Sequence, residues 1–147
     1  MADTPFSLRL IDVSKHFDGF DVSHVTLGVP RGCVVGLVGR NGAGKTTLMR
    51  MALGSLAPDS GRVEHTAKLG AVSAVCPYPT EMTVPDVERM HRLAFSAFDR
   101  TLFEKTCAAL DLPIDGKRTI KELSRGMGMK LQLAAAVASG STCLVMD

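Results

Sequence analysis

Apolar and polar residues alternate along two segments, residues 7–13 and residues 25–29. A period of two is typical of half-buried β-strands, so we predict one strand in each segment. Asp18-Gly19, a common turn sequence, lies between them. The first part of the chain is therefore expected to form a β-hairpin.

The next apolar run does not alternate. Residues 33–38 are almost continuously apolar, which is typical of a buried strand in a parallel sheet. Residues 45–53 follow with apolar positions at helical spacing, and Gly54 provides a helix stop. Shorter strands are expected around residues 62–65 and 69–75.

Helical patterns dominate the second half of the chain. Thr83 followed by Asp86 predicts the start of one helix, and Asp99 predicts the start of another, because these residue types cap helix amino ends. A third helix is predicted over residues 125–139, and an apolar strand over residues 143–146. Helices placed between buried strands indicate an α/β domain with a helical subdomain.

Composition narrows the class of protein. The 147 residues suit a single domain, and an apolar content of 46% is sufficient for a hydrophobic core. The net charge of +2 gives no support for a nucleic-acid-binding surface. Cys33 and Cys143 lie in apolar runs, where we expect buried thiols in a reducing compartment. Neither a secretory signal nor a membrane span is expected, since the first residues lack a basic and apolar leader and residues 131–146 are too short to cross.

A glycine-rich segment carries the main candidate chemistry. It matches the pattern G-x-x-x-x-G-K-[ST] at every fixed position, and it comprises Gly39, Arg40, Asn41, Gly42, Ala43, Gly44, Lys45 and Thr46. Glycines let the backbone turn tightly, so that N–H groups up to Thr47 converge on a phosphate at a helix start. Lys45 is expected to reach the terminal phosphates, and Thr46 to offer its hydroxyl to Mg²⁺. The alternative is a glycine-rich turn with an exposed lysine, but the strand predicted before it and the helix predicted after it favour a phosphate-binding loop.

The loop alone leaves several classes of enzyme open, because small kinases, GTPases and motor ATPases share it. The guanine-reading pattern N/T-K-x-D does not occur in the sequence, which argues against a GTPase. A soluble phosphotransferase would need arginines that close over the phosphates. Arg89, Arg92 and Arg100 are more typical of solvated helix charges.

Two later motifs complete a resemblance to a known family. Leu123-Ser124-Arg125-Gly126-Met127 precedes the third helix, and the last apolar strand ends in Asp147. In this order after the glycine-rich loop, they resemble the signature motif and Walker B strand of the ATP-binding subunit of an ABC transporter, of the small bacterial exporter type. The glycine-rich loop would be its Walker A motif. The resemblance implies an α/β fold of the P-loop NTPase class and ABC type, with a small antiparallel β subdomain and a helical subdomain.

The resemblance also implies roles for single residues. Ser124 and Gly126 would present a hydroxyl and N–H groups to the γ-phosphate of ATP held by a partner subunit. Asp147 would hold Mg²⁺ against the nucleotide, and it would share the catalytic chemistry with Lys45. Phe17 would stack on the adenine base. The alternatives are a capped surface helix, an acid without a role and an aromatic ring packed into the hairpin.

The sequence also departs from the family pattern. Arg125 replaces the first glycine of the signature and Met127 replaces its glutamine. Ala74 stands where the family often has a glutamine near Mg²⁺. The family's catalytic glutamate would follow Asp147 directly, and the sequence has no such position. We therefore expect an N-terminal piece of a longer subunit that lacks turnover by itself.

The expected ABC ATP-binding domain, residues 1–147, is accordingly partial and incomplete at its C-terminus. Its predicted parts are a β subdomain over 1–30, a P-loop core over 31–76 with 140–147, and a helical subdomain over 77–139.

The expected function is binding and hydrolysis of ATP with Mg²⁺ to energise a membrane transporter. The expected partners are a transmembrane permease subunit and a second ATP-binding subunit, in a homo- or heterodimer, and no nucleic acid. The subunit would be cytoplasmic and peripheral on the inner face of the plasma membrane, through its permease. Two alternatives stay open: a nucleotide-binding module that does not hydrolyse, and a soluble P-loop phosphotransferase.

Overall fold

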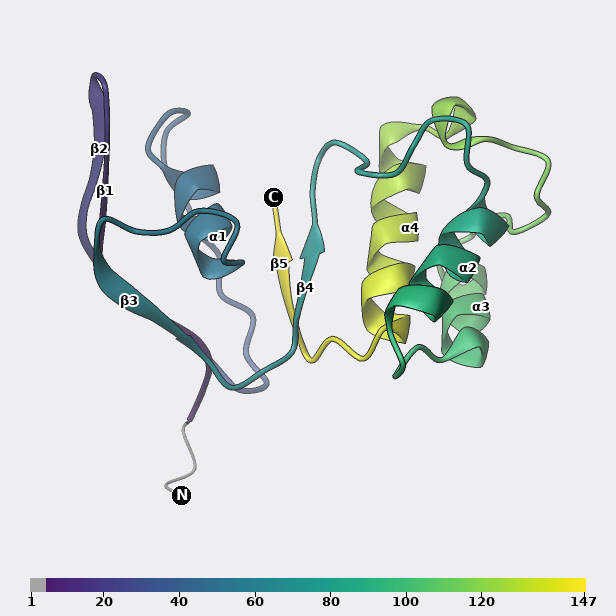
Figure 1. The fold of residues 1–147 in the computed structure, drawn as a ribbon, viewed down its shortest axis with the longest axis horizontal. Coiled ribbons are helices and arrows are strands. Elements are labelled where there is room, and N and C mark those ends of the chain that lie inside the picture. Colours follow the sequence, from purple (N-terminus) through teal and green to yellow (C-terminus); the bar gives the residue numbers. More distant parts are fainter. Residues whose placement is uncertain (1–4) are drawn as a thin grey trace. The chain divides into compact units, whose positions relative to one another are not determined.

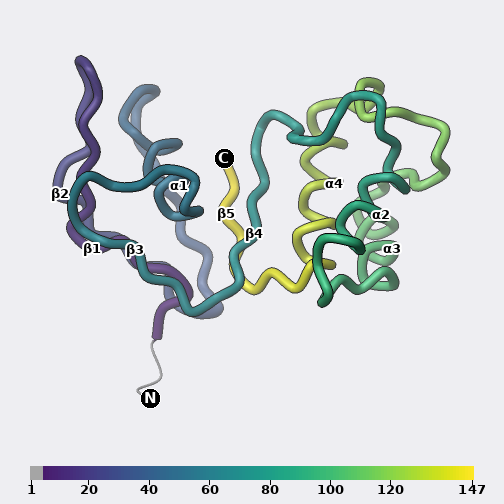
Figure 2. The backbone as a smooth tube through the Cα atoms, viewed as in Figure 1, coloured from purple at the N-terminus to yellow at the C-terminus, as the bar shows by residue number. Residues whose placement is uncertain are grey.

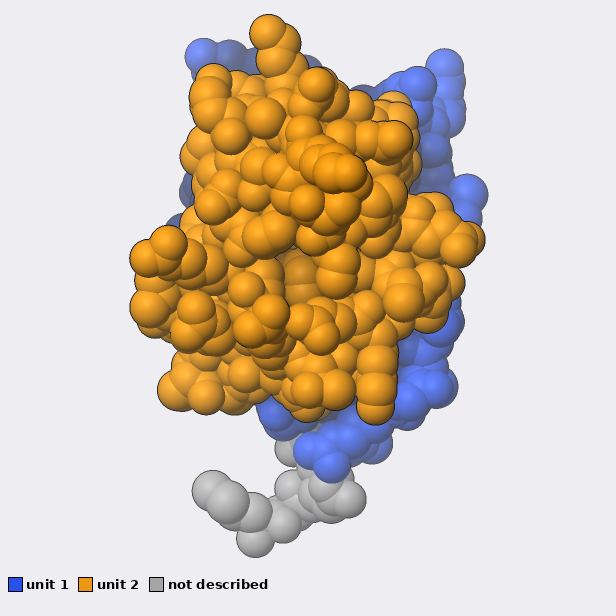
Figure 3. Space-filling model, turned by 90° about the vertical axis from the view of Figure 1, so that its right-hand side faces the viewer, with its two compact units in different colours: residues 1–68 blue, residues 69–147 orange. Residues whose placement is uncertain are grey.

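The computed structural model describes residues 5–147, and its contacts divide the chain into two compact units, residues 1–68 and residues 69–147 (Figure 3). Each unit has buried apolar side chains of its own. Those of the first unit are Leu8, Leu10, Val13, Val22, Leu48, Met51 and Ala52.

The first unit contains a three-stranded antiparallel sheet in the order β2-β1-β3 (Figure 1). β1 (Phe6–Phe17) and β2 (Phe20–Pro30) form the predicted hairpin around Asp18-Gly19, although both strands are longer than predicted. β3 (Ser60–His65) pairs with the other edge of β1. The expected antiparallel β subdomain is therefore present, and it also recruits a strand from far along the chain.

Bulges interrupt the hairpin where two residues adopt left-handed backbone angles. Asp12 has φ 52° and His24 has φ 51°, values that side-chain-bearing residues rarely adopt. Side chains bond the backbone here: Asp12 N donates to Thr26 Oγ1 at 3.0 Å, and His24 N donates to Ser14 Oγ at 3.0 Å. His24 Nδ1 also lies 2.9 Å from Asp12 Oδ1. These bonds satisfy polar groups that the shifted ladder does not pair.

The helix α1 (Lys45–Ala52) of the first unit lies where the sequence predicts it. Leu48 and Met51 are buried on the face that contacts β1. The helix ends at Ala52 with Leu53 as its C-cap, and Gly54 follows with φ 72°, a left-handed angle that terminates helices. Gly54 is therefore the predicted stop.

The second unit places one helix between a small sheet and two further helices (Figure 1). β4 (Leu69–Val72) and β5 (Cys143–Met146) form a parallel pair whose carboxyl ends lie at the same edge (Figure 2). α4 (Arg125–Ala138) packs on β4 with one side, and on α2 (Val84–Ala94) and α3 (Arg100–Ala109) with the other. This unit supplies the predicted helices and the last predicted strand.

Small residues allow α4 to approach the sheet closely. A Cβ atom placed on Gly70 of β4 would lie 2.9 Å from Ala136 Cβ, closer than real side chains pack. The opposite side of α4 contributes to the main core of the unit. That core comprises Val84, Val87, Phe103, Cys107, Leu112, Ile120, Leu131, Ala134, Ala135 and Ala138.

The predicted helix caps are confirmed. Thr83 and Asp86 form a reciprocal capping box at the start of α2, with Thr83 N donating to Asp86 Oδ2 at 2.9 Å. Asp99 Oδ1 accepts from Leu102 N at 2.9 Å at the start of α3. Each bond satisfies backbone N–H groups that the first helical turn cannot pair.

The buried strand predicted over residues 33–38 is wrong. These residues adopt no regular secondary structure, and Val34 and Val38 are 101% and 94% exposed. Cys33, predicted to be buried, is exposed as well. A strand needs hydrogen-bonded neighbours, and within residues 5–147 the only parallel pairing joins β4 to β5. Apolar composition suits this segment for burial but does not supply the neighbouring strands.

The two compact units do not coincide with the three predicted parts. β3 lies in the predicted P-loop core by sequence, yet it pairs with β1 in the first sheet. The division into β, core and helical parts stays a prediction. Among residues 5–147, no helix combines the length and apolar character needed to span a bilayer.

A hydrogen-bonded chain ties His91 of α2 to two other segments of the second unit. His91 Nδ1 lies 3.0 Å from Ser139 Oγ, and the Ser139 hydroxyl donates to Ala135 O at 2.7 Å. Since that hydroxyl has one proton, Nδ1 is the donor to Ser139, and Nε2 accepts from the Tyr78 hydroxyl at 3.0 Å. Burial lowers the pKa of His91, and burial raises the pKa of Tyr78, so both groups are neutral at pH 7.

We predict that acid destabilises the second unit through His91. Below about pH 6.5 the unfolded chain takes up a proton that the folded chain resists, so the free energy of unfolding falls as pH drops. His91→Phe should flatten this dependence, whereas His65→Gln, a change of an exposed histidine in β3, should not. Urea titrations followed by tyrosine fluorescence measure it, because Tyr78 is the only tyrosine and tryptophan is absent from the sequence. If acid lowers the free energy of unfolding of His91→Phe as much as that of the wild type, His91 is not the group responsible.

Candidate functional site

The glycine-rich segment of the first unit forms a compact loop before α1. Gly42 and Gly44 have φ angles of 82° and 88°, the left-handed conformation that glycine adopts without strain. Ala43 N donates to Arg40 O at 3.1 Å, which closes a turn inside the loop. The structure thus builds the predicted loop over Gly39 to Thr46.

The Lys45 side chain folds back onto this loop. Its ammonium donates to Gly39 O and to Arg40 O, both at 2.8 Å. An ammonium has three donors, so these two bonds leave one N–H for an incoming group. The loop therefore surrounds a half-buried positive charge.

The start of α1 adds further positive character. Its N-cap, Gly44, offers no side-chain acceptor, and its first turn contains no acidic residue. The helical hydrogen-bond ladder begins with Leu48 N donating to Gly44 O at 2.9 Å. N–H groups before that point, from Lys45 to Thr47, and the helix dipole both favour an anion here.

Side chains of β2 support the loop from behind. A Cβ atom on Gly44 would lie 2.7 Å from Val22 Cγ2 and 3.0 Å from Phe20 Cζ, so both side chains press against the loop backbone. The sequence analysis did not identify Phe20 and Val22. Their spacing of two residues in β2 places them on one face of the strand and was the available signal.

Phe17, the predicted adenine contact, packs on Phe20, which in turn lies against Gly44 of this loop. The two rings stack across the hairpin end with centroids 6.2 Å apart and an interplanar angle of 25°. Phe17 is 43% exposed, so part of its side chain is accessible from solvent. The first unit therefore brings an aromatic ring and the candidate phosphate loop together.

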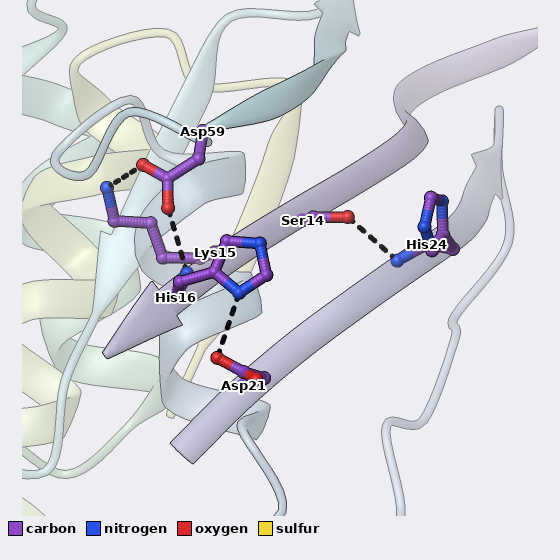
Figure 4. Close-up of polar contacts among 6 residues, drawn as sticks. All are labelled: Ser14, Lys15, His16, Asp21, His24 and Asp59. Atoms are coloured by element: carbon purple, nitrogen blue, oxygen red, sulfur yellow. Dashed lines mark hydrogen bonds and ion pairs between the residues drawn. The ribbon is translucent and has the colours of Figure 1, made fainter. Parts of the chain in front are cut away.

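An acidic clamp holds the segment that follows α1 (Figure 4). Asp59 accepts from Lys15 Nζ at 2.6 Å and from His16 N at 2.8 Å, and Asp59 N donates to Ser14 O at 2.8 Å. The hydrogen bond from Lys15 lowers the pKa of Asp59, so the carboxylate stays charged near neutral pH. Figure 4 also shows His16 paired with Asp21 in the same hairpin. Asp59 was not among the residues predicted from the sequence to support the site.

The remaining predicted site residues lie in the second unit. Ser124 caps α4, its Oγ accepting from Met127 N at 3.2 Å, and both Ser124 and Gly126 are exposed. Asp147 directly follows β5 and donates its N–H to Val72 O at 2.9 Å. Ser124 therefore begins a helix and Asp147 ends a parallel strand, as predicted.

Residues 5–147 contain no group of three or more His, Cys, Asp or Glu side chains that could hold a metal ion. Mg²⁺ at a nucleotide is usually held by one or two protein groups together with phosphate oxygens and water.

Comparison with known proteins decides the family. The family model described as "ABC transporter" matches residues 22–147. The chain belongs to the ABC transporter family. The predicted resemblance is confirmed, and the match does not support the alternative of a soluble phosphotransferase.

Three curated ABC relatives illustrate the match. The chain is 33% identical to a "Probable metal transport system ATP-binding protein" of Thermotoga maritima, over 95% of the chain and 61% of the relative. It is 31% identical to a zinc import ATP-binding protein of Rickettsia prowazekii, over 92% of the chain and 59% of that relative. It is 29% identical to a daunorubicin resistance ATP-binding protein of Streptomyces coeruleorubidus, over 100% of the chain and 51% of that relative. The chain thus spans about half to three fifths of the length of these relatives.

Solved structures of ABC proteins share the fold. An ATP-binding subunit of an ABC transporter matches with a TM-score of 0.80 at 20% identity, over 95% of this chain and 65% of that one. An ATP-binding cassette of an ABC transporter in its ADP conformation matches with a TM-score of 0.77 at 23% identity, over 98% of this chain and 69% of that one. The predicted ABC-type α/β fold is therefore confirmed.

Two glycine substitutions separate backbone strain from crowding in the Walker A loop. Gly42→Ala places a side chain at φ 82° in open space, so we expect only the strain of a left-handed residue, about 1–2 kcal/mol. Gly44→Ala has similar strain and also meets Val22 and Phe20, so its loss of unfolding free energy should be larger by about 1 kcal/mol or more. Urea unfolding of the two variants compares them. Equal losses would show that β2 does not support the loop.

Proposed function

We propose that this chain is the ATP-binding part of an ABC transporter subunit, and that its Walker A loop grips the triphosphate. The observation that carries this proposal is the Lys45 ammonium, bonded to Gly39 O and Arg40 O beside the uncapped start of α1. One cation and several converging N–H groups match the charge and the shape of a phosphate chain. ATP would supply the phosphoanhydride whose cleavage drives transport.

The other residues of the loop complete the nucleotide site. Arg40, Asn41 and Ala43 would contribute backbone N–H groups, with Gly42 and Gly44 providing the turns. Thr46 would offer its hydroxyl to Mg²⁺ and Asp147 its carboxylate, consistent with the chemistry of hard oxygen donors. The exposed ring of Phe17 would stack on adenine, with Phe20 behind it.

Ser124 and Gly126 would serve the nucleotide of a second ATP-binding subunit. The start of α4 is exposed and has no acidic residue in its first turn, which suits the approach of a γ-phosphate. Two copies related by a twofold axis would each provide this helix start to the other. ATP would then join the two subunits, and its hydrolysis would release them.

A transmembrane permease is the proposed further partner. The relatives' names refer to metal transport, zinc import and daunorubicin resistance, which supports a role in moving a solute across a membrane. The subunit would act from the cytoplasmic side, held at the membrane by the permease.

Replacement of Lys45 tests nucleotide binding. Lys45→Ala removes a charge-assisted contact worth about 1.5–3 kcal/mol, so the Kd for ATP should rise about ten- to a hundredfold. Arg62→Ala, which removes an exposed cation of β3 that pairs with Glu64, is the matched control and should leave the Kd unchanged. Titration calorimetry measures both. An unchanged Kd in Lys45→Ala would contradict the loop assignment.

Turnover separates an ATPase from a binding-only module. The full-length subunit is expected to release phosphate from ATP in a reaction that requires Mg²⁺ and is lost in Lys45→Ala, because the ammonium stabilises charge that develops on the phosphates. A coupled phosphate-release assay measures this. Tight ATP binding without any phosphate release would favour the non-hydrolysing module.

A further inference from the structure

The only glutamine in the sequence is buried in the second unit. Gln132 lies in the middle of α4 and is 3% exposed. A buried amide is costly unless its donors and acceptor are all paired, so its hydrogen bonds show what it holds.

Gln132 bonds both backbone groups of Ser73, the residue directly after β4. Its Oε1 accepts from Ser73 N at 2.8 Å, and its Nε2 donates to Ser73 O at 3.0 Å. The second Nε2 proton points to Gly128 O at 3.3 Å, one turn earlier in α4. The amide therefore pairs with Ser73 as a neighbouring strand would, and every one of its donors is used.

The same stretch of β4 holds Asp147. Val72, directly before Ser73, accepts from Asp147 N at 2.9 Å. Backbone groups of consecutive strand residues point to opposite sides, so Val72 is bonded to the β5 side while Ser73 is bonded to α4. One peptide unit of β4 thus joins the Walker B aspartate to the buried amide.

The helix that carries Gln132 also carries the signature serine. Ser124 caps α4, and Gln132 lies eight positions after the cap, about 12 Å along the helix. A continuous path of short bonds and rigid helix therefore links the backbone of Asp147 to that of Ser124, entirely within the second unit.

We propose that Gln132 is a positioning residue of the ATP reaction, which fixes Asp147 relative to the signature helix so that its carboxylate is aimed at Mg²⁺. This inference rests on the proposed function. Groups that orient a metal ligand typically change metal affinity by about 10- to 100-fold when they are removed. Gln132 acts on Asp147 through Val72 and Ser73 and does not touch the nucleotide.

Gln132→Glu provides a variant whose bonds can be switched by pH. The ionised carboxylate has no proton for Ser73 O or Gly128 O, whereas the protonated acid again has one donor and one acceptor. Burial raises the pKa of a carboxyl group. We therefore expect the Mg²⁺-dependent gain in ATP affinity, relative to wild type at the same pH, to fall about tenfold at a pH above that pKa and to recover below it. Titration calorimetry of ATP with and without Mg²⁺, at two pH values, measures this ratio.

Ser73→Ala is the matched control. It deletes the serine hydroxyl, which donates to Val75 O and lies 3.3 Å from Gln132 Oε1, but it keeps the N–H and C=O that make the two shorter bonds to Gln132. Its Mg²⁺-dependent gain should equal that of wild type. A merely structural role of Gln132 would lower stability in Gln132→Glu and leave the Mg²⁺ dependence unchanged at both pH values, and that result would overturn the inference.

Amide hydrogen exchange of the wild-type chain gives a second measurement that does not require a folded variant. The amides of Ser73 and Asp147 should exchange as slowly as those in the middle of α4, and fast exchange at Ser73 would overturn the inference. A wild-type chain that binds no ATP would remove the proposed function and this inference with it. Binding that is lost in Lys45→Ala, but whose Mg²⁺ dependence Gln132→Glu leaves unchanged, would remove the inference alone.

Discussion

The left-handed turn at Gly44 is the constraint on which the candidate site depends. At this one residue the loop must reverse direction, α1 must begin, and the backbone must lie against Phe20 and Val22. Only a residue without Cβ meets all three requirements. The turn also places Lys45 as the first residue of the helix, where its side chain can bend back to Gly39 O and Arg40 O. The positive centre is thus built before any phosphate arrives, which lowers the entropic cost of binding.

The second unit is organised in a comparable way around one element, α4. One side of the helix packs on β4, where Ala136 faces Gly70, and the other side contributes Leu131 and Ala135 to the core with α2 and α3. Its start is capped by Ser124, and its middle holds the end of β4 through Gln132. The same helix therefore carries a candidate phosphate contact and supports the strand pair that ends in Asp147. The match to the ABC family agrees with this combination of motifs on one polypeptide.

The elements that could be predicted from the sequence are those whose determining interactions are local. The caps Thr83, Asp99 and Ser124 bond backbone groups no more than three positions away, so their signals are complete in the sequence. The Walker A pattern is similar, because its glycines act on their own backbone angles. The strand expected over 33–38 failed because strand formation depends on neighbours elsewhere in the chain.

Long-range contacts account for the residues that were missed. Gln132 and Ser73 are 59 positions apart, and neither has a local pattern that points to the other. The clamp between Lys15 and Asp59 spans 44 positions. Phe20 and Val22 lie outside the strand predicted over residues 25–29, and their contact with Gly44 requires the hairpin to fold over the loop.

The close packing of Gly70 on Ala136 sets the thickness of the layer between strand and helix. Gly70 has no side chain and Ala136 has only a methyl group, so the room for a larger residue at one position depends on the residue at the other. A bulkier residue at one position would push β4 away from α4, and β5 would move with β4 because the two strands share a ladder. The tolerance of Gly70 to substitution is therefore limited on several sides at once, because a Cβ atom there would also lie 2.7 Å from Ser141 Oγ and 2.9 Å from Leu144 Cδ2.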